Sequence, residues 1–318
     1  MPVVFGKAPG KIILFGEHAV VYGQPAIAIP VKKVKATAHV LPKISSEAGQ
    51  VHIEAPDIDV DADLKSLDEK DPLGKAIHLT LEAVSPNHTP SFTLQISSNI
   101  PISAGMGSGA AITVAIIRAL SSFLGKSLPD EKISELAYEV EKIHHGTPSG
   151  IDNNVIAYQK PVYFVRGEPI QFLSIEQPTH WVIADTGQKT PTHETVSAVR
   201  ALHAAYSTRF GDIFNQIGSI THNARTPLVK GELEAMGWLM NENQRLLEKL
   251  SVSSPALDHL IKTARSAGAY GAKLSGGGRG GNMIALASPD KIESVEEALK
   301  QVGAKSVITT LLPKAETD

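Results

Sequence analysis

The glycine-rich stretch Pro101–Ala111 is the segment of the chain best suited to bind a phosphate group. Its alternating glycines, Gly105, Gly107 and Gly109, expose backbone N–H groups with no side chains in the way. The apolar run Ala110–Leu124 that follows is typical of a buried helix. A helix N-terminus adds free N–H groups and the positive end of the helix dipole. Phosphate oxygens are natural ligands for such a concavity, although a tight turn that only starts the helix stays an alternative.

This loop does not fit the two best-known nucleotide motifs. Gly105, Gly107 and Ala110 have the spacing of a dinucleotide fingerprint, which also needs a strand ending at the loop and an acid closing a second strand about 20 residues on. Here the downstream acids, Asp130 and Glu131, open a helix instead. A P-loop is excluded because no Gly-Lys-Ser/Thr follows at the required spacing.

Two acids flank a turn rich in glycine, proline and serine. Glu141 lies near the end of a predicted helix at 131–145, and Asp152 follows the turn. One such carboxylate can hold Mg²⁺ while the other faces an acceptor hydroxyl, as phosphoryl transfer requires. A capped helix end with an Asx turn is the alternative. Glu141 and His144 have the spacing of a zinc pair, but no partner motif accompanies them.

A second glycine loop, Ser275–Gly281, has five glycines in six positions. A strand follows it rather than a helix, so the nucleotide fingerprint fails here as well. We interpret this loop as a close approach of the backbone to a ligand or to another domain. Arg279 within it is expected to be a solvated loop residue rather than a phosphate ligand.

The composition limits the classes of protein that can carry these loops. Apolar residues make up 42% and charged residues 20% of the 318 positions, which is typical of a folded protein. A net charge of −3 provides no basic field for nucleic acid. No apolar run approaches the roughly 18 residues of a membrane span, the N-terminus lacks a signal peptide's apolar core, and the chain has no cysteine. We therefore expect a cytoplasmic enzyme or binding protein with no nucleic-acid or membrane partner.

The elements that must position these loops can be outlined from periodicity. Alternation and apolar runs predict strands at 34–41, 51–55, 91–97, 161–165, 180–185, 272–274, 282–287 and 306–312. Helical spacing predicts helices at 72–83, 110–124, 131–145, 191–210, 212–221, 231–250, 255–266 and 291–302. A polar surface loop is expected at 57–71, and a domain boundary at 166–169. The second half mixes strands and helices in an α+β pattern.

The chain resembles the GHMP family of small-molecule kinases. The resemblance is carried in order by Pro9–Gly23, Gly105–Ala111, His145–Asn153 and Lys273–Gly281, with a further familiar run at Met240–Leu247. It covers nearly the whole chain. It implies an α+β, two-domain GHMP kinase fold, in which residues 1–168 form an N-terminal domain with a left-handed βαβ element. Residues 169–318 would form a ferredoxin-like C-terminal domain, with the active site between the two.

The resemblance also assigns roles to individual residues. It implies that Asp152 and Lys11 are catalytic, with Asp152 against the acceptor hydroxyl and Lys11 beside the γ-phosphate. Glu141 and Ser108 would hold Mg²⁺. The acceptor would be bound by Glu17, His18 and Ser149, and ATP by Pro101, Ala104, Gly105, Met106, Gly107, Ser108, Gly109, Ala110 and Ala111. One position departs from the family, which usually has a second serine where this chain has Gly109, so either Ser108 or water replaces that hydroxyl. In the last loop, Gly277, Arg279 and Asn282 stand where alanine, glycine and cysteine are often seen.

The activity that the resemblance implies is the ATP-dependent phosphorylation of mevalonate to 5-phosphomevalonate in isoprenoid biosynthesis, because the first and third blocks favour mevalonate over galactose or homoserine. Alternatives are a related kinase that acts on phosphomevalonate or on the tertiary hydroxyl of mevalonate, and a non-catalytic ligand sensor. The block Gly16–Gly23 has no lysine or arginine for a substrate phosphate. Gly109 is compatible with a sensor, whereas Lys11, Glu141 and Asp152 together favour an enzyme. The oligomeric state stays open, a homodimer included.

Overall fold

The computed structural model describes residues 4–43, 49–86, 88–101, 105–145, 148–188 and 190–316. The chain forms two compact units that interleave along the sequence. The first comprises Met1–Lys11, Val34–Pro101 and Gly107–Gln159, and the second comprises Ile12–Lys33, Ile102–Met106 and Lys160–Asp318. Strand β1 (Val4–Phe15) and its neighbour β2 (Ala26–Pro42) supply residues to both units. The domain boundary expected near residue 168 stays a prediction.

The first unit contains a βαβ element. Strands β3 (Val51–Ala55) and β5 (Phe92–Ser98) pair in parallel, with Ile53 opposite Leu94, and helix α1 (Pro72–Val84) lies between them in the chain. Parallel neighbours need such a crossover. The short strand β4 (Val60–Asp63) pairs with β3, and the last residues of β2 pair with β5. The βαβ element that the resemblance implies is therefore present in this unit.

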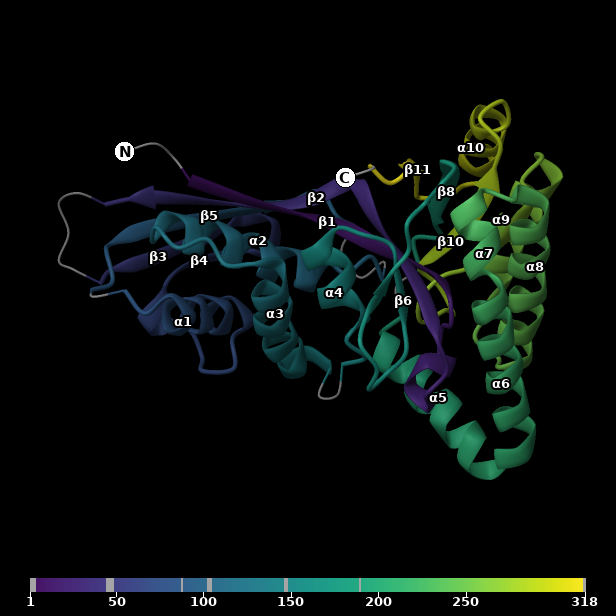
Figure 1. The fold of residues 1–318 in the computed structure, drawn as a ribbon, viewed down its shortest axis with the longest axis horizontal. Coiled ribbons are helices and arrows are strands. Elements are labelled where there is room, and N and C mark those ends of the chain that lie inside the picture. The colour runs from purple at the N-terminus through teal and green to yellow at the C-terminus, as the bar shows by residue number, and fades with distance from the viewer. Residues whose placement is uncertain are drawn as a thin grey trace. The chain divides into compact units, whose positions relative to one another are not determined.

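Four helices accompany these strands in the first unit (Figure 1): α1, α2 (Ser108–Phe123), α3 (Asp130–His145) and α4 (Ile151–Tyr158). Helix α1 begins at Pro72 because the Asp71 carboxylate accepts hydrogen bonds from the backbone N–H groups of Leu73 and Gly74. Helix α2 is buried over most of its length, as its apolar composition predicts.

The sheet of the second unit has the strand order expected for a ferredoxin-like fold. Its described strands, β8 (Thr179–Asp185), β9 (Gly271–Leu274), β10 (Asn282–Ala287) and β11 (Ser306–Leu312), pair antiparallel in the order β11-β8-β10-β9. In chain order this is fourth, first, third, second, with helices before β9 and before β11. Helices α9 (Pro255–Ser266) and α10 (Ile292–Gln301) pack against this sheet.

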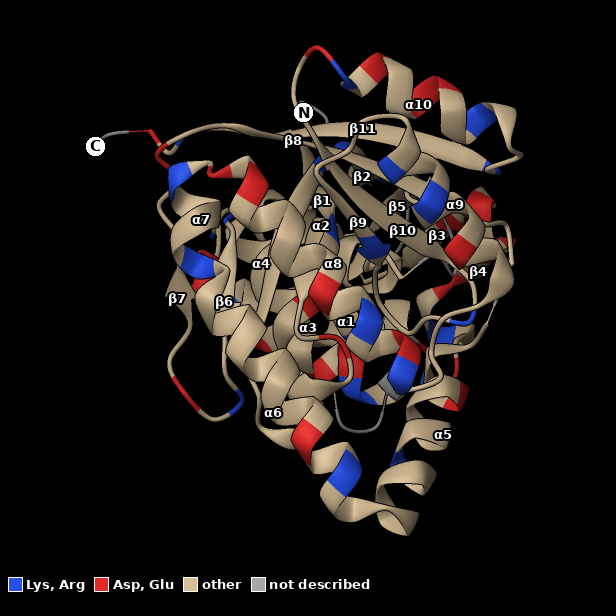
Figure 2. Ribbon diagram, turned by 90° about the vertical axis from the view of Figure 1, so that its right-hand side faces the viewer, with Lys and Arg blue, Asp and Glu red and all other residues tan. Residues whose placement is uncertain are grey.

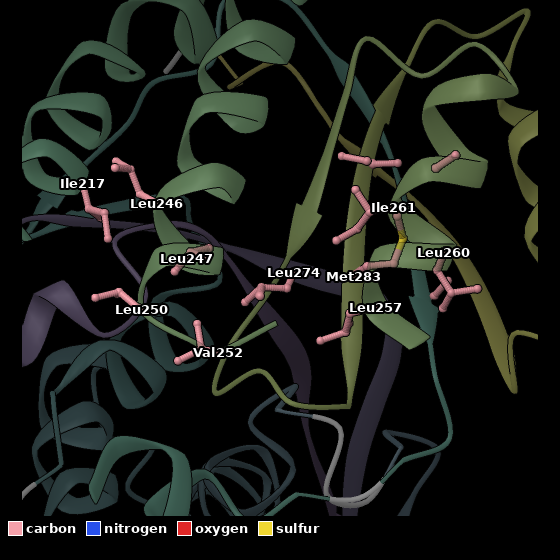
Figure 3. Close-up of a cluster of buried hydrophobic side chains, with 14 of the residues drawn as sticks. Ile217, Leu246, Leu247, Leu250, Val252, Leu257, Leu260, Ile261, Leu274 and Met283 are labelled. Carbon is pink, nitrogen blue, oxygen red and sulfur yellow. The ribbon is translucent and has the colours of Figure 1, made fainter. Parts of the chain in front are cut away.

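The remaining helices of this unit are α5 (Thr192–Ala205), α6 (Ser207–Asn223), α7 (Arg225–Lys230) and α8 (Leu233–Lys249). Side chains from α6, α8, α9, β9 and β10 form a buried apolar cluster (Figure 3) that includes Ile217, Leu247, Leu260, Leu274 and Met283. Short strands β6 (Val162–Phe164) and β7 (Gln171–Phe172) extend from the first residues of β2, and the 3₁₀ turn Ala19–Tyr22 precedes β2.

Two expectations about local structure are wrong, and helix α4 was not predicted. The helix predicted at 191–210 is two helices, because Tyr206 has φ −137° and ψ 57° and interrupts the helical backbone. The predicted surface loop 57–71 contains β4 and the 3₁₀ turns Pro56–Ile58 and Leu64–Ser66. Pairing with β3 forms this strand despite its acidic composition, and His52 of β3 lies 2.9 Å from both Asp61 and Asp63. The turn before Asp152 leads directly into helix α4.

Helices α6 and α10 carry charges of both signs. Glutamates Glu293, Glu296 and Glu297 are followed by Lys300 along α10, and α6 carries Arg209 and Asp212. Figure 2 shows both signs on these helices. In the part of the chain that the structure describes, no helix combines the length and apolar character that crossing a membrane would take.

Candidate active site

An ion pair between Lys11 and Asp152 lies at the centre of the candidate site in the first unit. Lys11 comes from β1 and Asp152 from the first turn of α4, and Nζ lies 2.9 Å from Oδ1. The lysine is buried, while 28% of the aspartate side chain is exposed. The structure therefore brings together the two residues that the resemblance names as catalytic and leaves the carboxylate accessible.

Helix α4 is fixed against α3 by side-chain hydrogen bonds, which sets the position of Asp152. The Asn153 amide donates to the carbonyl and hydroxyl oxygens of Ser134, at 3.1 and 2.9 Å, and the Ser134 hydroxyl donates to Asn154 at 2.8 Å. Gly150 adopts φ 91° just before the helix, and Ser149 accepts a hydrogen bond from the N–H of Ile151 at 3.4 Å. Ser149, expected at the acceptor, thus lies at the start of the helix that carries Asp152.

Glu141 of α3 is the third charged residue of this site. It is 5% exposed. The pKa of its carboxyl group is raised to about 7, mainly by burial and also by the negative charge of Asp152, while the charge of Lys11 opposes this shift. Glu141 is thus close enough to both members of the ion pair to interact with their charges. A buried carboxylate beside a second carboxylate is a group that a cation would stabilise.

The glycine loop meets this group of charges at Gly107. This residue has φ 71° and precedes α2, and a Cβ atom added to it would lie 2.8 Å from Ile156 Cδ1 and 3.0 Å from Lys11 Cγ. The aliphatic part of Lys11 therefore runs directly past the N-terminus of α2. The N–H of Ala111 bonds to the Gly107 carbonyl at 2.9 Å, so the N–H groups of Ser108, Gly109 and Ala110 have no partner within the helix itself.

The other residues expected to bind ATP lie around this helix start. Met106 and Ala111 are buried, Pro101 is half-buried and Gly105 is exposed. Ala104 lies outside the described residues. Ser108 is the first residue of α2, where a hydroxyl can face a ligand held by the helix N-terminus.

The remaining predicted residues, Glu17 and His18, belong to the second unit. Glu17 is buried and forms an ion pair with Lys273 of β9. The Nε2 atom of His18 lies 3.0 Å from the carbonyl oxygen of Gly277, so this nitrogen carries the proton and donates. The pKa of His18 is lowered to about 4, mainly by burial and also by the charges of Arg279 and Lys273, while the hydrogen bond to Gly277 opposes this shift. The imidazole is therefore neutral at pH 7.

The backbone of the second glycine loop lies close to other residues of the second unit. A Cβ atom added to Gly278 would lie 2.0 Å from the Val252 carbonyl oxygen. Arg279, expected to be a solvated loop residue, is half-buried with φ 59°, and its Nε donates to the Ser251 carbonyl at 3.2 Å. The close backbone approach that the glycines predict is therefore made, at least in part, to residues 251–252.

Sequence reasoning missed Lys273 as a separate functional candidate. It stands in the buried strand Gly271–Leu274, directly before the glycine loop. A lysine inside a buried strand is rare unless it is paired, and this was the signal available in the sequence. The partner could not be found in the same way, because Glu17 lies 256 positions away.

The fold and this site define a small-molecule kinase, and comparison with known proteins agrees. Residues 73–160 match the family described as GHMP kinases N terminal domain, and residues 224–305 match the family described as GHMP kinases C terminal. The chain belongs to the GHMP kinase family.

Among its relatives in that family are proteins named mevalonate kinase. The protein of Thermococcus gammatolerans is 37% identical over 97% of this chain and 96% of its own length. That of Pyrococcus furiosus is 34% identical with the same coverage. A crystal structure of L. major mevalonate kinase in complex with R-mevalonate superposes with a TM-score of 0.82 at 29% identity, and covers 100% of this chain and 97% of that one.

Proposed function

We propose that this protein transfers the γ-phosphoryl group of ATP to the primary hydroxyl of mevalonate and forms 5-phosphomevalonate. The observation that carries the proposal is the ion pair of Lys11 with Asp152 beside both Glu141 and the N-terminus of α2. A phosphate-binding helix start, a cation-binding carboxylate and an exposed acid next to a lysine are the parts that phosphoryl transfer requires. The relatives named mevalonate kinase support mevalonate as the acceptor.

The N–H groups of Ser108, Gly109 and Ala110 would bind the phosphate oxygens of ATP. They are the donors of α2 that have no partner within the helix itself, and the positive end of the helix dipole adds to their attraction for an anion. Pro101, Ala104, Gly105, Met106, Gly107 and Ala111 would complete this nucleotide-binding segment. Lys11 passes beside Gly107, so its ammonium group is placed to stabilise negative charge that develops on the transferred phosphoryl group.

Asp152 would orient the acceptor hydroxyl and take its proton. Its pairing with Lys11 fixes one carboxylate oxygen, and 28% of the side chain stays exposed to an incoming alcohol. A carboxylate is a weak base for an alcohol, but the proton is transferred late in a loose transition state, as charge moves onto the phosphate. Alignment of the two reactants therefore supplies most of the acceleration.

Glu141 and Ser108 fit a bound Mg²⁺, because their oxygens are hard donors and Glu141 is a buried carboxylate that interacts with the negative charge of Asp152. Among the described residues no three histidine, aspartate or glutamate side chains form a metal site of their own. This agrees with a cation that is held largely by nucleotide phosphates. When bound, Mg²⁺ would neutralise phosphate charge. Gly109 provides no second hydroxyl, so Ser108 is the loop side chain proposed to contact it.

Glu17, His18 and Ser149 are proposed to bind mevalonate. The proton of the neutral His18 is on Nε2, which donates to Gly277, so Nδ1 can accept a hydrogen bond from the substrate without introducing a charge. Glu17 is held in place by Lys273. These roles rest on the resemblance of their sequence blocks to those of the family.

An ADP-release assay with mevalonate, phosphomevalonate, galactose and homoserine tests the proposal. We expect turnover with mevalonate at a kcat/KM at least about 10²-fold above the other three acceptors. ³¹P and ¹³C NMR of the product should place the phosphate on the primary hydroxyl. Preference for phosphomevalonate, or a phosphate on the tertiary hydroxyl, would assign the protein to another activity of the family. Binding of ATP without ADP release would instead indicate a sensor.

A further inference from the structure

A fully buried ion pair joins two segments from opposite ends of the chain in the second unit. Lys273 of β9 and Glu17 both have side chains that are 0% exposed. The Lys273 ammonium group donates to Glu17 and also to the backbone carbonyl of Leu274, at 2.7 Å. Neither phosphate binding nor proton transfer in the proposed mechanism uses this lysine.

The direction of the Lys273 side chain follows from the strand. Successive residues of a strand point to opposite faces of its sheet. Ala272 and Leu274 belong to the apolar cluster on one face (Figure 3), so Lys273 points to the other face, where its Nζ lies 6.0 Å from the centre of the Phe15 ring. Burial lowers the pKa of Lys273, and pairing with Glu17 opposes that shift.

Stability alone is a poor explanation for such a pair. Removing two charges from water is costly, and apolar side chains of similar volume often replace a buried ion pair without loss of stability. What apolar residues cannot do is fix the direction of a carboxylate. The pair is therefore better explained by the position it gives to Glu17.

Two further hydrogen bonds join the same two segments. The Ser275 hydroxyl donates to the carbonyl of Ile13 at 2.8 Å, and His18 donates to Gly277 at 3.0 Å. Together with the ion pair, they hold residues 13–18 against residues 273–277 at three points. The held segment is unusual, because His18 has φ 61°, a conformation that non-glycine residues keep only when their surroundings impose it.

Strand β9 is a firm base for this attachment. On one side it pairs with β10, where Ile284 lies opposite Lys273. On the other side α8 covers its edge with amide side chains: Asn241 accepts from the N–H of Ala272 at 3.2 Å, and Gln244 accepts from the N–H of Leu274 at 2.9 Å. The backbone on both sides of Lys273 is therefore hydrogen-bonded.

We propose that Lys273 is a positioning residue for the acceptor: it fixes the Glu17 carboxylate, and with it the turn at residues 16–18, in the conformation that binds mevalonate. This inference rests on the proposed function, because it assigns Glu17 and His18 to the mevalonate pocket. Lys273 itself acts through Glu17 and does not bind ATP. Its loss should therefore affect the two substrates unequally.

The test compares Lys273→Met, Glu17→Gln and the double variant in steady-state kinetics, with mevalonate and ATP varied separately. Lys273→Met should raise KM for mevalonate at least about tenfold and leave KM for ATP within about twofold. In the Glu17→Gln background, Lys273→Met should raise KM for mevalonate by less than about twofold, because the residue through which Lys273 acts is already altered.

Leu260→Ala is the matched control. Leu260 is buried in the same unit, within the apolar cluster and away from the three attachment points. This variant should lower the melting temperature and leave both KM values within about twofold. Lys273→Gln, which keeps an amide donor for Glu17, is measured in parallel in case Lys273→Met does not fold. It should likewise raise KM for mevalonate and leave KM for ATP nearly unchanged.

Equal changes in the two KM values would overturn the proposal, as would a lower melting temperature with no change in either. Additive effects in the double variant, or a similar rise in KM for mevalonate in Leu260→Ala, would also overturn it. Absence of mevalonate turnover in the unaltered protein would overturn the proposed function together with this inference. Normal turnover with an unselective Lys273→Met would overturn the role of Lys273 alone.

Discussion

The Nζ atom of Lys11 lies 2.9 Å from Oδ1 of Asp152, and the aliphatic part of the same lysine runs past Gly107 at the start of α2. One side chain therefore connects the helix that would bind phosphate with the carboxylate that would receive a proton. The roles of Asp152, Gly107 and Glu141 can therefore be tested separately, because substitution of each residue should impair a different property of the protein.

Asp152→Asn should lower kcat at least about 10²-fold and leave the affinity for ATP nearly unchanged. The amide keeps the shape of the side chain but cannot take a proton, and the substitution leaves the N–H groups of Ser108, Gly109 and Ala110 that would bind ATP unchanged. Stopped-flow or coupled ADP release gives kcat, and binding of a non-hydrolysable ATP analogue gives affinity. Asp212→Asn, on the exposed face of α6, is the control and should match the unaltered protein. An unchanged kcat in Asp152→Asn would remove this residue from the mechanism.

Gly107→Ala should lower kcat at least about tenfold, whereas Gly105→Ala should change it less than about threefold. Both glycines have positive φ, 71° and 72°, so both variants carry similar backbone strain of about 1 kcal/mol. Only at Gly107 would the new Cβ atom press on Ile156 and Lys11, because a Cβ at Gly105 meets open space. The difference between the two variants thus isolates the displacement of Lys11. Equal losses of activity would show that strain alone is responsible.

The local sequence pattern was sufficient to predict those elements in which all residues favour the same secondary structure. Strand β10, strand β11 and helix α9 have the predicted bounds, and α9 begins at Pro255, where the Ser254 hydroxyl accepts a hydrogen bond from the N–H of Leu257. Strand β1 was not predicted, because Gly6, Pro9 and Gly10 interrupt its alternation. Gly6 is explained only by its neighbour, since a Cβ there would lie 2.3 Å from the Ala115 carbonyl oxygen of α2.

The candidate site likewise has some features that local sequence predicts and others that only the fold explains. The glycine loop before α2 was interpreted from its own residues, but the grouping of Lys11 with Asp152 came from family resemblance, since nothing in local spacing joins β1 to α4. Helix α4 has only eight residues, too few for a clear helical period, and depends on Asn153 and Asn154 bonding to α3. Lys273 pairs across 256 positions and could be found only in the fold. Tertiary contacts, which local propensity does not encode, determine these features.

Glu141→Gln should abolish most activity at saturating Mg²⁺ and at the same time stabilise the ligand-free protein at high pH. The folded-state pKa of about 7 lies above the usual 4.5, so the native state holds a proton between these values that the unfolded state releases. Stability of the unaltered protein therefore decreases as pH rises from about 4.5 to 7. The glutamine variant lacks this loss and should be more stable above pH 7, by up to about 3 kcal/mol.

Urea unfolding at pH 5 and pH 8, with and without Mg²⁺ and ATP, measures this effect. Glu139→Gln is the control on the same helix, because Glu139 is exposed and pairs with Lys142. Addition of Mg²⁺ and ATP should stabilise the unaltered protein more than Glu141→Gln. The cation-binding role of Glu141 would be contradicted if both variants gained equal stability from Mg²⁺ and ATP.

His18→Asn should make the protein less sensitive to acid. The pKa of His18 is about 4 in the folded state against 6.5 for a free histidine, so the unfolded state binds a proton between pH 6.5 and 4 that the native state refuses. As the pH falls through this window, His18 alone therefore lowers the free energy of unfolding by about 1.4 kcal/mol per pH unit.

Asparagine, like histidine, is found at positive φ more often than most residues, and it does not titrate. Urea unfolding from pH 7 to pH 4 should show a shallower slope in His18→Asn than in the unaltered protein or in His259→Asn, which replaces an exposed histidine of α9. Identical slopes in all three proteins would mean that folding does not lower the pKa of His18, which would contradict a buried imidazole that stays neutral below pH 6.5.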